Sequence, residues 1–196
     1  MKKIYILRHA EVDKNTRHYS LSSEGWENSI AFGDYLKNQT DFPIPDKFYS
    51  SDRARSIETA RIIIMKIGKN QDNLNINNVF GEFNPPDEEL AKIEKTEEYI
   101  NLTKEGKRAS LYFDWNGKKE AVNKYLDSVE NTLKTSESVL IVSHGNILNF
   151  ILFHLFPNDI RVQNNIETPN LSLTVIEKEG DNYSLSKICS TEWKNK

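Results

Sequence analysis

Two histidines in this chain follow short apolar runs of the kind that form buried strands. The first run extends from Ile4 to Leu7, and Arg8 and His9 follow it at once. Such a run is typical of a parallel strand that is buried on both faces. Because ligands bind outside the carboxyl ends of strands in open α/β sheets, this pair predicts an oxyanion clamp beside a nucleophile or base. The alternative is a surface dipeptide that ends a strand.

The same pattern recurs at the second histidine. Residues 139–142 form another apolar run, and Ser143, His144 and Gly145 follow it. Residues 146–156 then predict an apolar helix, whose N-terminus offers free N–H groups and a favourable dipole to an anion. Parallel strands that lie side by side would bring both histidines into one crevice. The residues therefore predict an oxyanion site, for which phosphate is the best fit.

The composition limits the fold and the partners. A chain of 196 residues, 37% of them hydrophobic, suffices for one well-buried domain. The net charge of −3 argues against nucleic acid or an anionic membrane surface as the main partner. Cys189 is the single cysteine and no apolar stretch approaches the length of a membrane span, so we expect a cytoplasmic protein. The sequence carries no indication of the oligomeric state.

Apolar periodicity predicts strands that alternate with helices. We expect helices over residues 26–36, 52–67, 87–101, 120–135 and 146–156, strands over 47–51 and 74–79, and a terminal hairpin of 171–176 with 183–188. This order is typical of an α/β protein, a three-layer α/β/α sandwich with a mostly parallel central sheet. We expect one domain over residues 1–196, with a lid-like excursion around residues 81–119.

Four motifs, in order along the chain, resemble those of the histidine phosphatase superfamily, which has the phosphoglycerate-mutase-like fold. They lie at residues 7–11, where L-R-H-A-E is similar to the R-H-G-E signature of that family, and at residues 21–25, 50–60 and 142–145. The Pro-Asn pair before the last predicted hairpin also resembles the family. The resemblance spans nearly the whole chain except for residues 83–119, and four motifs in the right order are a specific signal.

The chain departs from the family pattern at several positions. Ala10 replaces the usual glycine after the histidine, which would carry a modest strain if that position required a positive φ. Val12 stands where serine or threonine is common, and Lys14 stands where mutases often have tryptophan. Ser56 replaces an alanine. None of these changes removes a reacting group.

The resemblance implies phosphoryl transfer through a phosphohistidine, with His9 as the nucleophile. Alignment on the Thr-Ala pair at residues 59–60 puts the phosphate arginine of the family on Arg55 and not on Arg53. The residues that would hold the transferring phosphoryl group are Arg8, Asn15, Arg55, His144 and Gly145. Guanidinium groups match phosphate oxygens bidentately and supply positive charge, so we expect neither a metal nor a cofactor.

The leaving oxygen needs a proton, and in this family the donor is usually a glutamate before the lid. Glu82 follows an apolar pair at residues 79–80 and is our prediction for that donor. The alternatives are Asp87, Glu88 and Glu89, or a Glu82 that is only a solvated surface residue. A catalytic donor would need a pKa raised by burial or by a neighbouring phosphate.

These residues predict a metal-independent phosphatase that hydrolyses phosphate monoesters of small molecules. The alternatives are a cofactor-dependent phosphoglycerate mutase and a non-catalytic module that binds a phosphorylated ligand. The short chain favours hydrolysis over mutase transfer, and an intact His9 argues against a binding module, which needs no nucleophile. Residues 12–19 and 83–119, which would shape the pocket, match no substrate class.

Overall fold

A central sheet of six strands organises the molecule. The computed structural model describes residues 1–39, 42–105, 112, 113, 115, 117–163 and 167–195. The strands are β1 (Lys2–Arg8), β2 (Lys47–Ser50), β3 (Leu74–Ile76), β4 (Ser138–Ser143), β5 (Leu173–Glu179) and β6 (Asn182–Ser190). They lie in the order β3-β2-β4-β1-β5-β6. The first four are parallel to one another, β5 is antiparallel to β1, and β6 is antiparallel to β5. The predicted mostly parallel sheet with a terminal hairpin is confirmed.

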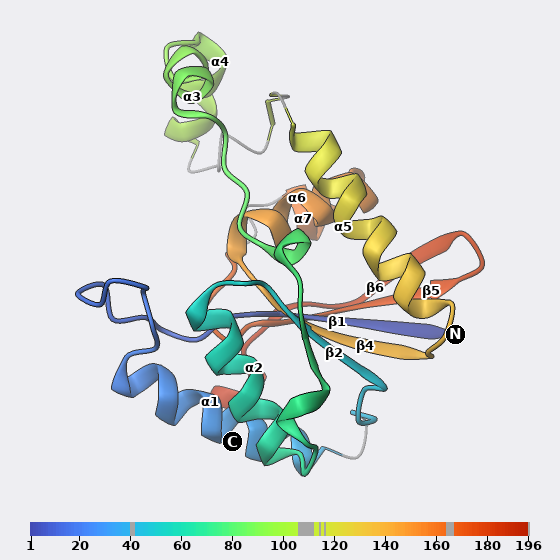
Figure 1. The fold of residues 1–196 in the computed structure, drawn as a ribbon. Helices are drawn as coiled ribbons and strands as arrows, with labels where there is room; N and C mark the ends of the chain where they lie inside the picture. Colours follow the sequence, from blue (N-terminus) through green and yellow to red (C-terminus); the bar gives the residue numbers. More distant parts are fainter. Residues whose placement is uncertain (40–41, 106–111, 114, 116, 164–166, 196) are drawn as a thin grey trace.

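Helices cover both faces of this sheet (Figure 1). On one face lie α1 (Ser23–Lys37) and α2 (Ala54–Lys66), and on the other α5 (Lys118–Leu133) and α6 (Gly145–Leu155). The shorter helices are α7 (Ile160–Gln163), η1 (Gln71–Asn73), η2 (Asn78–Phe80) and η4 (Glu192–Asn195). The three-layer α/β/α sandwich is thus confirmed. In the described part of the chain, no helix is long and apolar enough to cross a membrane.

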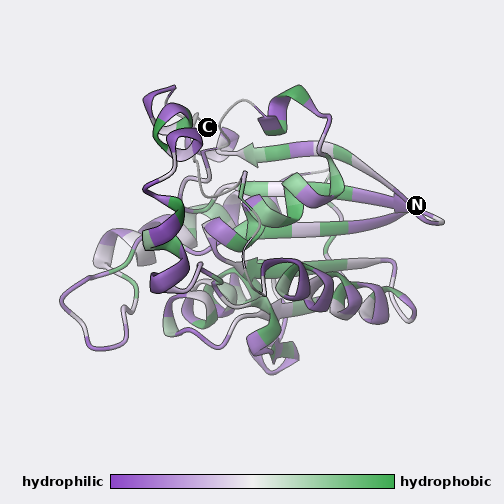
Figure 2. Cartoon of the chain, turned by 90° about the horizontal axis from the view of Figure 1, so that it is seen from above, coloured by the Kyte–Doolittle hydropathy of each residue, from purple (hydrophilic) through white to green (hydrophobic). Residues whose placement is uncertain are grey.

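The central residues of β1, 4–7, are apolar because they are covered on both faces. Ile4 and Ile6 pack in the core beneath α5 and α6, whereas Tyr5 and Leu7 pack in the core above α1 and α2. Successive side chains of a strand point to opposite faces, so a polar residue in either set would be buried in a core. Figure 2 shows hydrophobic residues along the strands of the sheet.

The strands β1 and β4 are immediate parallel neighbours. Leu7 lies opposite Val142, and Arg8 lies opposite Ser143. The ladder continues one residue further, where His9 N–H donates to the carbonyl oxygen of Ser143 at 3.0 Å. The two histidine segments therefore leave the sheet side by side, as the sequence predicted.

The excursion around residues 81–119 carries two helices that project away from the sandwich (Figure 1). They are α3 (Asp87–Ile93) and α4 (Glu97–Lys104). The prediction of one continuous helix was wrong, because Thr96 starts a new helix by accepting a hydrogen bond from the N–H of Tyr99 at 3.2 Å. The sequence also predicts a turn near Gly106, which lies outside the described residues. The role of the excursion as a lid stays a prediction.

Candidate active site

The ring of His9 has a defined tautomer at the carboxyl end of β1. Its Nδ1 lies 2.7 Å from the carbonyl oxygen of Ala10, so this nitrogen carries the proton and donates. Its Nε2 accepts from the Nε–H of Arg55 at 3.1 Å. Burial lowers the pKa of His9 to about 3, and the neighbouring Arg55 and Arg8 act in the same direction. The imidazole is therefore neutral at neutral pH, as a nucleophilic histidine must be.

His144 lies beside His9 and has the opposite tautomer. The ring centroids are 5.1 Å apart and the planes meet at 65°. The Nη2 of Arg55 lies 3.3 Å from Nδ1 of His144; a guanidinium only donates, so this Nδ1 accepts. The Nε2–H then donates to Oγ of Ser51 at 2.8 Å. Burial lowers the pKa of His144 to about 2, with further contributions from His9 and the arginines, so this ring is also neutral.

Thr59 connects the helix that carries Arg55 to the residue after His9. Its hydroxyl accepts from the N–H of Ala10 at 3.1 Å and donates to the carbonyl oxygen of Arg55 at 2.7 Å. The structure thus places Arg55 between the two histidines, while Arg53 is the N-cap of α2 with a largely exposed side chain. Ala10 has no positive φ, so the strain considered for an alanine at this position does not arise.

Arg8 lies against the first turn of α6. Its Nη1 donates to the carbonyl oxygen of Thr168. A methyl group on Gly145 would lie 3.6 Å from Nε of Arg8 and 2.8 Å from Oγ1 of Thr168. Glycine at this position therefore allows Thr168, whose carbonyl group binds Arg8, to approach the N-terminus of the helix. A helix N-terminus beside a guanidinium is a favourable environment for an anion.

A short segment, residues 80–84, runs along the start of α6 and places Glu82. The hydroxyl of Ser143 donates to the carbonyl oxygen of Phe80 at 2.7 Å. The N–H of Ile147 donates to Oε1 of Glu82 at 3.2 Å. The carboxyl group of Glu82 is thereby held at the N-terminus of the helix that follows His144.

The environment of Glu82 shifts the pKa of its carboxyl group upward. Burial raises its pKa, although the bond from Ile147 and the charges of Arg55 and Arg8 oppose this effect. The carboxyl group also adjoins a hollow of about 360 Å³ that Ile147 and part of α5 line. Glu82 thus has the raised pKa that a proton donor needs, and it lies near the two arginines that would hold a phosphate.

Asn15 makes no contact with the histidines in the part of the chain that the structure describes. It lies on an exposed loop, where its N–H donates to Oδ1 of Asp13 at 2.8 Å. The loop is closed by a bond from the N–H of Asp13 to the carbonyl oxygen of Ser20 at 2.9 Å. The N–H of Leu21 then joins it to Oε2 of Glu58, on α2, at 2.8 Å. A role for Asn15 in phosphate binding stays a prediction.

Two buried serines that we did not assign to the site from the sequence contact His144. Oγ of Ser51 lies 2.8 Å from its Nε2, and Oγ of Ser56 lies 3.4 Å from the same atom. Ser51 directly follows β2, so the rule that singled out the two histidines, polar residues at the ends of parallel strands, identifies it as well. Ser56 drew notice only as a departure from the family motif.

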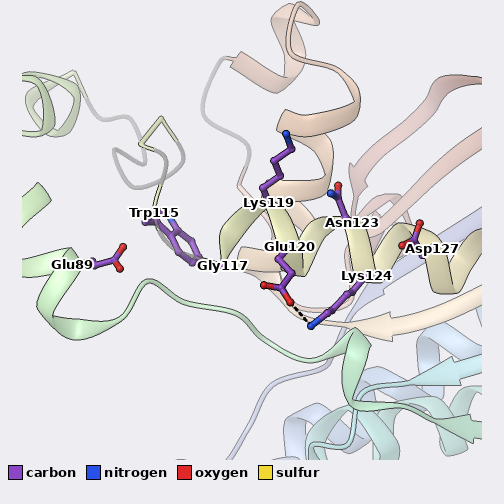
Figure 3. A pocket seen from close by; sticks show the side chains of 8 residues that line it. All are labelled: Glu89, Trp115, Gly117, Lys119, Glu120, Asn123, Lys124 and Asp127. Carbon is purple, nitrogen blue, oxygen red and sulfur yellow. Dashed lines mark ion pairs between the residues drawn. The ribbon is translucent and has the colours of Figure 1, made fainter.

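A separate hollow of about 810 Å³ lies between the excursion and α5 (Figure 3). The residues that line it are Glu89, Trp115, Gly117, Lys119, Glu120, Asn123, Lys124 and Asp127. Its charged groups include an ion pair between Glu120 and Lys124 at 2.6 Å. Glu89, an alternative proton donor, lines this hollow, whereas the two histidines do not. The hollow shares Gly117, Glu120 and Lys124 with the smaller one beside Glu82.

Cationic side chains surround the two histidines. Arg55 contacts both rings, and Arg8 lies beside Gly145. Over residues 1–39, 42–105, 112, 113, 115, 117–163 and 167–195, no three His, Cys, Asp or Glu side chains are grouped to hold a metal ion. The independence from metals stays a prediction.

Comparisons with known proteins identify the family and the fold. The family model described as histidine phosphatase superfamily (branch 1) matches residues 4–191. A mycobacterial glucosyl-3-phosphoglycerate phosphatase solved with VO3 superposes with a TM-score of 0.72 and 16% identity, over 97% of this chain and 100% of that chain. A phosphoglycerate mutase from Bacillus anthracis str. Sterne gives a TM-score of 0.70 and 20% identity, over 98% and 94%.

A mutant phosphoserine phosphatase from Entamoeba histolytica, solved with phosphoserine, gives a TM-score of 0.70 and 17% identity, over 98% of this chain and 99% of that chain. At these identities the three structures bear on the fold alone. A search of curated proteins found no match.

Proposed function

The chain belongs to the histidine phosphatase superfamily (branch 1), and we propose that it hydrolyses phosphate monoesters of small molecules through a phosphohistidine on His9. The observation that carries this proposal is the state of the His9 ring. Its Nδ1 donates to Ala10, so its Nε2 bears a lone pair, and that lone pair faces Arg55. Binding of a phosphorylated ligand without turnover does not need a histidine in this form.

In the first step, Nε2 of His9 attacks the phosphorus atom and the bond from phosphorus to the ester oxygen breaks. Arg8, Arg55 and the free N–H groups at the start of α6 stabilise the charge on the three other oxygens. Protonated Glu82 gives its proton to the leaving oxygen, so the alcohol departs neutral. The carbonyl oxygen of Ala10 accepts a hydrogen bond from Nδ1–H throughout, which stabilises the positive charge that develops on the ring.

In the second step, water attacks the phosphorus atom of the phosphohistidine. The Glu82 carboxylate takes a proton from that water, and the bond from phosphorus to Nε2 breaks. The lone pair returns to His9, and phosphate leaves. The sum is one ester and one water converted to one alcohol and one phosphate, with Glu82 protonated again.

Hydrolysis of p-nitrophenyl phosphate in the presence of EDTA tests the proposal. We expect activity in the wild type and a loss of at least about 10³-fold in His9→Ala, because the covalent route needs the imidazole. The matched control is His154→Ala, since His154 is an exposed histidine at the far end of α6. Quenched wild-type samples should contain an acid-labile phosphoryl group that is absent from His9→Ala.

Several outcomes contradict the proposal. Activity that persists in His9→Ala refutes the nucleophile, and activity that EDTA abolishes refutes independence from metals. Faster phosphoryl exchange between phosphoglycerates than hydrolysis, with bisphosphoglycerate present, indicates a mutase. No turnover on a broad panel of phosphate monoesters, combined with phosphate binding, indicates a binding module.

A further inference from the structure

The turn formed by residues 168–172 holds the main chain of the Arg8-His9 pair. The side-chain amide of Asn170 donates to the carbonyl oxygen of His9 at 2.8 Å. The N–H of Leu171 donates to the carbonyl oxygen of Arg8 at 3.1 Å. The guanidinium of Arg8 donates to the first carbonyl of the same turn. One turn therefore fixes two successive carbonyl groups and one catalytic candidate side chain.

Leu171 has a backbone conformation that leucine rarely adopts. Its φ is 56°, in the left-handed region that glycine favours, because a Cβ atom crowds the following carbonyl oxygen there. Its side chain is buried, with 1% exposure. A non-glycine residue persists in this conformation only where surrounding contacts hold it, and such residues cluster at functional sites.

Trp193 supplies one of those contacts from the 3-10 helix η4. Its Nε1–H donates to the carbonyl oxygen of Leu171 at 3.0 Å. The indole is itself fixed against Phe32 of α1, with ring centroids 5.7 Å apart and planes at 78°. An indole N–H has a single direction of donation, so a fixed ring orients the carbonyl group that it bonds. The resulting chain of contacts runs from Phe32 through Trp193 and Leu171 to Arg8.

We propose that Trp193 is a positioning residue for the phosphate site. Through the turn of Asn170 and Leu171, it fixes the main chain of Arg8 and His9 in the orientation that phosphoryl transfer requires. No described contact joins Trp193 to either histidine, so its effect on the reaction is indirect. The functional part of this inference rests on the proposed phosphatase activity, and the structural part does not.

The variant Trp193→Phe keeps an aromatic ring and removes the N–H donor. We expect kcat on p-nitrophenyl phosphate to fall by about tenfold, because small displacements of positioned groups cost large factors in rate. The matched control is Trp26→Phe, which makes the same change at a tryptophan of α1 that is 45% exposed and outside this chain of contacts. We expect Trp26→Phe to leave kcat within about twofold of the wild type.

Glycine at position 171 supplies a rescue test. Glycine adopts a positive φ without support from neighbours, so it does not need the bond from Trp193. We expect Leu171→Gly in the Trp193→Phe background to recover most of the lost kcat, while Tm falls because a buried leucine side chain is removed. A purely structural role for Trp193 predicts no recovery of kcat.

Amide NMR spectra give a readout that needs no turnover. We expect the resonances of Arg8, His9 and Ala10 to shift in Trp193→Phe and to stay in place in Trp26→Phe. If the wild type hydrolyses no ester, these shifts still support the positioning contact while the proposed function fails. Unshifted amides in Trp193→Phe, or an equal loss of kcat in Trp193→Phe and Trp26→Phe, would overturn the inference.

Discussion

Arg55 donates its Nε–H to Nε2 of His9 across 3.1 Å, so the cation covers the lone pair that would attack phosphorus. The same guanidinium reaches Nδ1 of His144 at 3.3 Å. Phosphoryl oxygens are stronger acceptors for a guanidinium than an imidazole nitrogen is. We therefore expect Arg55 to turn toward an arriving phosphate, which frees the His9 lone pair at the moment when a substrate is present.

The raised pKa of Glu82 predicts how the reaction depends on pH and on the leaving group. The carboxyl group keeps its proton to a higher pH than an ordinary glutamate, and the donor is lost as pH rises through that raised pKa. His9, with a pKa of about 3, stays neutral throughout this range. We expect the kcat of an alkyl phosphate to fall on the alkaline side of its optimum, and Glu82→Gln to lower it about 10²-fold or more.

The control for Glu82 is the leaving group itself. p-Nitrophenolate departs without a proton, so Glu82→Gln should lower kcat/KM, which reports the first step and not the attack of water, much less for p-nitrophenyl phosphate than for an alkyl phosphate. Glu88→Gln, at an exposed carboxylate of α3, should change neither reaction. Equal losses of kcat/KM on both esters in Glu82→Gln would show that Glu82 does not donate the proton.

Ser51 and Ser56 should differ in their effect on His144. Ser51 bonds its Nε2 at 2.8 Å, whereas Ser56 lies 3.4 Å away, at the limit of hydrogen bonding. We expect Ser51→Ala to lower kcat/KM about tenfold because the ring loses the partner that fixes its tautomer. Ser56→Ala restores the residue of the family motif and should stay within about twofold of the wild type. Equal losses in steady-state assays would contradict this ranking.

A methyl group at position 145 should disturb phosphate binding through Thr168. The added carbon would lie 2.8 Å from Oγ1 of Thr168 and 3.6 Å from Nε of Arg8. We expect Gly145→Ala to lower stability by about 1–3 kcal/mol, as overpacking does, and to weaken phosphate binding. Thr168→Ala in the same chain removes the closer contact and should restore part of Tm. Thermal unfolding with and without phosphate measures both effects, and a double variant no more stable than Gly145→Ala would refute the contact.

Gly25 should be the glycine of α1 that tolerates alanine least. A Cβ atom there would lie 2.1 Å from the carbonyl oxygen of Glu11, which is main chain and cannot turn aside. We expect Gly25→Ala to lower the free energy of unfolding by about 3 kcal/mol or more. Gly180→Ala is the control, because that glycine has a φ of +58° and open space around it, and should cost about 1 kcal/mol. Urea unfolding compares the two, and similar losses would contradict the close approach.

The parts of the site at the strand ends could be predicted from the sequence. Two apolar runs identified β1 and β4, and the rule for parallel sheets then brought His9 and His144 to one edge. Ser51 satisfies the same rule, since it ends the strand predicted over residues 47–51, but we did not assign it to the site. These inferences worked because a strand buried on both faces leaves an unambiguous apolar pattern in the sequence.

The supports of the site could not be predicted from local patterns. A leucine gives no signal of a left-handed backbone, so the conformation of Leu171 follows from its tertiary contacts and not from its residue type. The bond from Trp193 to that carbonyl joins two segments outside the regular sheet. In the excursion, Thr96 lies inside the helix predicted over residues 87–101. A threonine followed by two glutamates is equally typical of the N-terminus of a helix, and the structure has that arrangement.

The place of β1 in the sheet has a consequence for folding. Ile4 pairs with Val139 on one side and with Ile176 on the other. Both partners of the first strand therefore lie more than 100 residues further along the chain. Pairings of such long range form slowly, and until they form β1 exposes an apolar ribbon with two open edges. The bond from His9 N–H to Ser143 both extends the β1–β4 ladder and brings the two histidines together. The two histidines therefore come together only when the long-range pairing of β1 with β4 has formed. In a refolding experiment, we expect activity to return at the end of folding.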